Sequence, residues 1–143
     1  MKQVFIALIA LSLAYSQESC VGSKVVLNAR YDSVFISRVD GMKSLTASLY
    51  SNIQASPDKS FATHKPAYQA IDTGLAVLVA DEANRSKNKA IAYQAQTTLE
   101  MFRTYAKEHE SKGSVANTQA KVYAKYLSDI FDIWLKTERS LNK

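Results

Sequence analysis

Glycine and proline are scarce in this chain, with 4 glycines and 2 prolines in 143 residues. Both residues mark frequent turns, so their scarcity favours long helices over many short strands. Polar breaks fall at residues 55–60, 84–89 and 110–114. Four amphipathic segments with short connections predict an all-α fold, an antiparallel up-down bundle of four helices, with three helices and a disordered N-terminal arm as the alternative. The predicted helices cover residues 25–54, 66–83, 87–110 and 115–141.

Local signals place the ends of these helices. The β-branched start of the first segment also permits strand or coil there. Pro66 is predicted to open the second helix, because proline suits a first helical turn, and residues 61–65 before it form either an added helical turn or a loop. Ser86 is the predicted N-cap of the third helix, Gly113 its stop, and Ser114 the cap of the fourth.

The last segment has a broader apolar face than an ordinary bundle helix needs. Its apolar side chains spread over about 220° of the helix circumference and its polar side chains over about 100°. Aromatic residues at helical spacing commonly form a core. Alternatively, the surplus face lines a pocket for a small apolar ligand, or packs against a partner or a second copy. The predicted binding residues are Tyr123, Tyr126, Ile130, Phe131 and Trp134.

The N-terminus has the pattern of a secretory signal peptide. Lys2 supplies a positive charge, and the apolar run over residues 4–13 is too short to span a bilayer. Small residues favour cleavage before Gln17, with cleavage before Tyr15 as the alternative. This predicts a secreted, extracellular protein with a signal peptide over 1–16, an N-terminal arm over 17–24 and a single helical-bundle domain over 25–143.

Two residues are candidates for covalent modification in that compartment. Cys20 is the only cysteine, which excludes an intrachain disulfide and leaves an intermolecular disulfide, giving a homodimer, or a free thiol. Asn84 begins the only Asn-x-Ser/Thr sequence and is the candidate glycosylation site.

The formal net charge of +5 comes from basic residues scattered along the chain. The densest patch, Arg85, Lys87 and Lys89, is too small for a nucleic-acid footprint and has no aromatic residues interleaved. No second apolar stretch approaches membrane-spanning length, so no stable membrane insertion is expected.

Chemistry-bearing residues are few, and we expect no enzyme, cofactor or metal site. His64 precedes the second predicted helix, and His109 lies at the end of the third, where a histidine suits the helix dipole. Neither has a second ligand at metal-binding spacing. Glu82 projects near the apolar stripe of its helix, but its place in the last turn predicts an escape to solvent.

The sequence therefore predicts a secreted, non-enzymatic helical binding protein that carries a small apolar ligand between its helices. The alternative is an extracellular protein–protein interaction factor, such as an effector or signalling ligand, with a filled core and a receptor-binding surface. A cavity bordered by residues 115–141 would separate the two. A cationic membrane-active protein is a third alternative, although Asp129 and Asp132 mix acids into the polar face of that segment.

Overall fold

The computed structural model describes residues 32–85 and 89–140. Over these residues the chain is all-helical, and the prediction of four bundled helices is confirmed. The helices are α2 (Ser33–Ala55), α3 (Phe61–Arg85), α4 (Lys89–Lys112) and α5 (Asn117–Ser140). The predicted signal peptide 1–16, the arm 17–24 and Cys20 lie outside the described residues.

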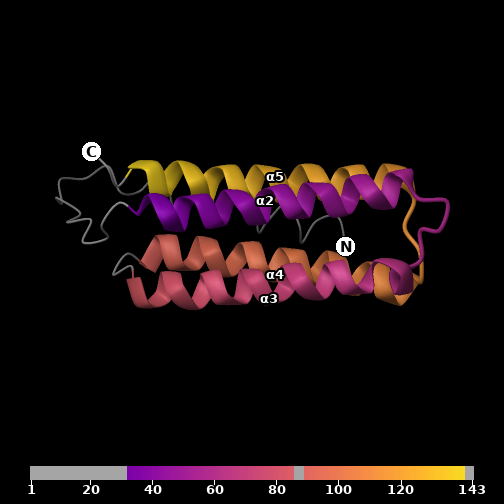
Figure 1. Ribbon diagram of the computed structural model, residues 1–143, viewed down its shortest axis with the longest axis horizontal. Coiled ribbons are helices and arrows are strands. Elements are labelled where there is room, and N and C mark those ends of the chain that lie inside the picture. The colour runs from indigo at the N-terminus through magenta and orange to yellow at the C-terminus, as the bar shows by residue number, and fades with distance from the viewer. Residues whose placement is uncertain (1–31, 86–88, 141–143) are drawn as a thin grey trace, which may run out of the picture.

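The four helices form a ring in cross-section. α2 packs against α3 and α5, and α4 packs against the same two helices. Figure 1 shows α2 beside α5 and α3 beside α4 along the whole bundle. The start of α2 and the end of α5 lie at the same end of the bundle. The contact between the Phe35 and Trp134 rings, whose centroids are 6.1 Å apart, shows this arrangement. None of the described helices is long and apolar enough to cross a membrane.

Helix α2 begins later than the predicted helix that starts at residue 25. Asp32 has an extended backbone, and its Oδ1 accepts hydrogen bonds from the backbone N–H groups of Val34 and Phe35, each at 3.0 Å. This side chain satisfies amides that have no partner within the helix. Asp32 is therefore the N-cap of α2, so the predicted continuous helix over 25–54 does not hold at this point, and residues 25–31 lie outside the described residues.

Helix α3 begins at Phe61 rather than Pro66, so residues 61–65 form the added helical turn and not the loop. The Asp58 carboxylate accepts hydrogen bonds from the Ser60 backbone N–H at 2.8 Å and from the Thr63 hydroxyl at 2.5 Å. These caps stabilise one turn before the proline, so Pro66 stands inside the helix.

The connection after α4 was anticipated in part. Gly113 has a φ of 73°, the left-handed conformation that glycine adopts without strain, and it ends the helix as predicted. The next helix begins at Asn117, where the Ala120 N–H bonds to the Ala116 carbonyl at 2.9 Å. Ser114 is therefore not its cap; this serine instead forms an isolated bridge with Ser60.

Aromatic side chains dominate the core. The Tyr105 and Tyr123 rings stack with centroids 4.2 Å apart, joining α4 to α5. The buried Trp134 contacts Phe35 of α2 and stacks on Phe131 of its own helix at 6.4 Å. Large rings of this kind bury the most apolar area per residue, so they fasten α5 to both of its neighbours.

Candidate functional site

The five residues predicted to bind a ligand or partner fall into two environments. Tyr123, Phe131 and Trp134 are buried in the core. Ile130 is half-buried, and Tyr126 is exposed at 45% of its surface. The structure therefore does not bring these five side chains together on one surface.

Helix α5 carries two apolar faces rather than one wide face. We call the outer one the α5 stripe and define it as Val122, Tyr126, Ile130 and Ile133. These residues lie within about 80° of one another at about 100° per residue. Val122 is exposed at 43% and Ile133 at 50%. The broad apolar arc read from the sequence is thus a buried core face plus this exposed stripe.

The α5 stripe lies on the α4 side of the helix. Asp132 forms an ion pair with Lys43 of α2 at 2.5 Å, which fixes the opposite side. Tyr126 of the stripe lies near Tyr105 of α4, since it adds to the effect of burial that raises the pKa of Tyr105 to about 12. This proximity places the stripe toward α4.

Basic side chains border the stripe. A shallow hollow at its N-terminal end is lined by Lys121, Val122, Lys125 and Tyr126. Lys125 also pairs with Asp129 at 2.7 Å, and both side chains are largely exposed. Among the exposed residues of α5 as a whole, four are basic and two are acidic, so the exposed surface of this helix carries an excess of positive charge. The basic residues are Lys121, Lys125, Lys136 and Arg139.

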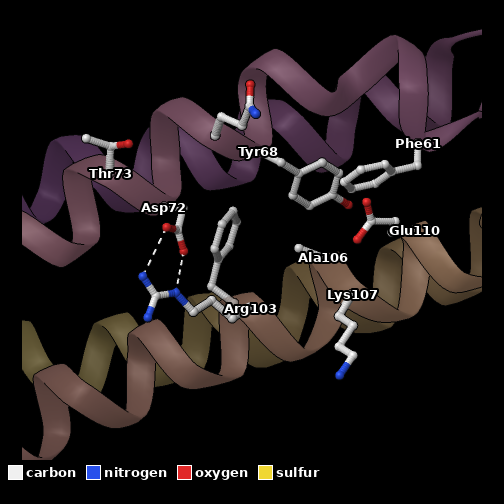
Figure 2. A pocket seen from close by; sticks show the side chains of 10 residues that line it. Phe61, Tyr68, Asp72, Thr73, Arg103, Ala106, Lys107 and Glu110 are labelled. Atoms are coloured by element: carbon white, nitrogen blue, oxygen red, sulfur yellow. Dashed lines mark hydrogen bonds and ion pairs between the residues drawn. The ribbon is translucent and has the colours of Figure 1, made fainter.

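A second hollow, between α3 and α4, was not anticipated from the sequence. Figure 2 shows Phe61 and Tyr68 side by side at one end and the Asp72–Arg103 ion pair at the other. The Arg103 Nε and Nη2 atoms donate to the two Asp72 carboxylate oxygens at 2.5 and 3.0 Å. Tyr68 and the remaining ring, Phe102, are almost fully buried. The hollow is therefore a surface groove that opens to solvent rather than an enclosed cavity.

The end of the bundle formed by the two interhelical connections contains both histidines, and we call it the histidine end. The His109 Nε2 lies 2.8 Å from the Lys59 carbonyl and its Nδ1 lies 3.0 Å from the Tyr68 hydroxyl. Since a carbonyl only accepts, Nε2 carries the proton and Nδ1 accepts from Tyr68. Burial lowers the pKa of His109, which favours this neutral form. The His64 Nε2 lies 3.2 Å from the Asp58 carbonyl.

The described side chains around these histidines do not form a group that could hold a metal ion. Their ring centroids are 6.4 Å apart, and no group of three metal-ligating side chains occurs in residues 32–85 and 89–140. The described ring nitrogens bond to backbone and hydroxyl oxygens, so the histidines hold the connections in place.

The opposite end contains two buried glutamates and one arginine, and we call it the acid end. The Arg85 Nη2 donates to Glu82 Oε2 at 2.6 Å and to Glu138 Oε2 at 2.7 Å. Both glutamate side chains have 0% exposure, so the expected escape of Glu82 to solvent is wrong. Arg85 also lies over the Phe35 ring, with Cζ 4.1 Å from its centroid. A shared cation makes burial of these carboxylates tolerable.

Glu138 was missed by sequence reasoning. It follows Trp134 by four residues and Phe131 by seven, which places it on the buried face of α5. That spacing is the signal that would have found it, but a glutamate in a last helical turn is usually solvated.

The candidate glycosylation site lies beside this cluster. Asn84 is exposed in the last turn of α3, and the serine of its sequence motif lies outside the described residues. Its glycosylation stays a prediction.

Comparisons with protein families, with curated proteins and with solved structures find no match to this chain.

Proposed function

We propose that this chain is a secreted helical protein that binds a protein partner through the α5 stripe and catalyses no reaction. The observation that carries the proposal is the exposure of aligned apolar side chains on α5, including a tyrosine. Exposed apolar residues that line up on one helix are typical of a binding surface, whereas scattered ones are not.

The packing of the core favours this function over the carriage of an apolar ligand. The residues expected to line an internal pocket contact other side chains instead, as the Tyr105–Tyr123 stack and the Trp134 contacts with Phe35 and Phe131 show. The two hollows described above both open to the surface. A carrier needs an enclosed apolar space that would bury most of its ligand.

The charge beside the stripe indicates the chemistry of the partner. Lys121 and Lys125 line the hollow at one end of the stripe, and Lys136 lies beyond its other end. A partner that inserts apolar side chains over Tyr126 and Ile133 and surrounds them with acidic groups complements this surface. Full burial of each large stripe residue would contribute about 1–2 kcal/mol.

Export and helix order belong to the same proposal. The leader over residues 1–16 would be cleaved, and the partner would be met outside the cell. Connections as short as 56–60 and 113–116 favour the antiparallel up-down order, because consecutive helices must turn back at once.

The experiment compares the full secreted chain with a Tyr126→Ser/Ile133→Ser double variant, using a photoreactive amino acid introduced at Val122 to cross-link bound extracellular proteins. Tyr93→Ser is the matched control, since Tyr93 is an exposed aromatic residue on another helix, α4. We expect the wild type and the control to give the same cross-linked protein, and the double variant to lose it. Weaker cross-linking at higher salt is expected from the lysine border.

Two results would contradict the proposal. One is equal cross-linking by the double variant. The other is an apolar small molecule that co-purifies with the native protein and changes the fluorescence of Trp134, which would support the carrier instead.

A further inference from the structure

Two acidic side chains and one basic side chain meet inside the acid end, so their charges do not cancel when all three are ionised. Glu82 and Glu138 are both fully buried, and both bond through Oε2 to the same Arg85 nitrogen. If both carboxyl groups were ionised, the cluster would carry one uncompensated negative charge. An uncompensated buried charge is strongly unfavourable.

The second oxygen of each carboxyl group gives independent evidence that a proton is present. Glu82 Oε1 and Glu138 Oε1 are buried and have no hydrogen-bond partner among the described residues. Two carboxylate oxygens cannot bond to each other, because both only accept. A single proton held between the two carboxyl groups supplies the missing donor and removes the excess charge.

The other charged groups at this end that the structure describes do not supply that compensation. Arg38 of α2 pairs with Asp81 of α3 at 2.7 Å, and both side chains are more than two-fifths exposed. The remaining described charges at this end are outside the core or only half-buried, and they are Asp32 on α2, Lys89 on α4, and Lys136 and Arg139 on α5. Within residues 32–85 and 89–140, Glu82 and Arg85 are therefore the groups that set the state of Glu138.

We propose that Glu138 and Glu82 share one proton, and that release of this proton loosens the end of the bundle where α3 and α5 finish. The proton acts as a removable link between residues 56 positions apart in the sequence. Because the cluster joins α3 to α5 and also contacts Phe35 of α2, its loosening reaches three helices.

The direction of the pH response follows from linkage. Burial raises the pKa of Glu138 from 4.5 to about 7, assisted by a hydrogen bond with Glu82. An unfolded or opened Glu138 releases its proton near pH 4.5, whereas the folded form keeps it up to about pH 7. Between these values the closed form binds more protons, so the opening equilibrium constant rises by up to about tenfold per pH unit.

The test measures backbone hydrogen exchange of the full chain at several pH values, expressed as protection factors for the last turns of α3 and α5. For the wild type, we expect protection to fall by up to about 100-fold between about pH 5 and pH 7. Glu138→Gln keeps the shape of the protonated side chain, so its protection should vary by less than about threefold over that interval. Glu100→Gln, an exposed residue on α4, is the matched control and should follow the wild type.

Infrared spectroscopy supplies an independent readout. The wild type at about pH 6 should show the C=O stretch of a protonated carboxylic acid. This band should disappear in Glu138→Gln and in Glu82→Gln, because the one remaining carboxylate then pairs with Arg85. The second variant keeps the test decisive if the first fails to fold. Constant wild-type protection, an unchanged pH response in Glu138→Gln, or absence of the band would each overturn the proposal.

Discussion

The two ends of this bundle bury ionisable side chains in different ways. At the histidine end, His109 stays neutral, and both of its ring nitrogens bond to neutral groups, the Lys59 carbonyl and the Tyr68 hydroxyl. At the acid end, two carboxyl groups compete for the nitrogen of Arg85. One end therefore meets its hydrogen-bonding needs without charge, while the other depends on a charge balance that pH can change.

The ends consequently respond to pH in opposite directions. The folded pKa of His109 lies below its ordinary value of 6.5, so the stability it contributes is present above pH 6.5 and is lost as pH falls. The folded pKa of Glu138, about 7, lies above its ordinary value of 4.5, so its contribution is present below pH 4.5 and is lost as pH rises to about 7. Acid weakens the histidine end, and neutral pH weakens the acid end.

The largest effect is expected from Arg85→Met. This change leaves two buried carboxyl groups without their shared cation, so the free energy of unfolding should fall by about 3–5 kcal/mol at neutral pH. The loss should be smaller at about pH 5, where protonation relieves the excess charge. Chemical denaturation at both pH values measures it, with Arg103→Met as the surface control. Equal losses of unfolding free energy for the two variants would show that the buried cluster depends on its arginine no more than an exposed ion pair does.

A smaller effect is expected from His109→Phe at the histidine end. The ring volume is nearly kept, but the Tyr68 hydroxyl and the Lys59 carbonyl lose their partners, which should cost about 2 kcal/mol. The variant should also lose the part of the acid sensitivity that His109 provides below pH 6.5. Thermal unfolding followed by circular dichroism across this range checks both effects. If the acid sensitivity is unchanged in His109→Phe, a group other than His109 causes it.

Gly113→Ala should cost about 1 kcal/mol, because the glycine φ of 73° is strained for a residue with a Cβ. Nothing lies within 4 Å of the added methyl group, so the cost comes from the backbone alone. Gly41→Ala, an exposed mid-helix position on α2 that is equally open, is the control and should raise stability by about 0.5–1 kcal/mol. Denaturation midpoints of the two variants should therefore shift in opposite directions.

The smallest effect is expected from Arg38→Ala at the rim of the acid end. Its ion pair with Asp81 is well exposed, so solvent screening should limit the loss to about 0.5 kcal/mol. A loss as large as that for Arg85→Met, measured in the same denaturation series, would mean that the rim and the buried cluster act as one unit.

The sequence predicted the helices better than it predicted the polar clusters. Helical periodicity and Gly113 gave four helices and the end of α4, because these signals are local. The early start of α3 depended on Asp58 and Ser60, cap residues whose pattern was present but was outweighed by Pro66. Local pattern alone does not reveal burial of Glu82, because its partner Glu138 lies on another helix.

The candidate site was predicted in part for a related reason. The excess apolar arc of α5 was recognised, but the residues chosen came from both of its faces. Periodicity measures the angle between side chains and not which neighbouring helix covers them. Tyr126 is exposed and Tyr123 buried because α4 reaches one of them and leaves the other at the rim.

The contact of Phe35 with Trp134 also has a topological consequence. The first and last turns of the described helices lie together, as Figure 1 shows, so a short peptide could join residue 140 to residue 32 and close the fold into a circle. A circular chain reopened within residues 56–60 would keep every helix pair in contact while changing their order along the chain. Segments attached at residues 32 and 140 would therefore leave the bundle from the same end.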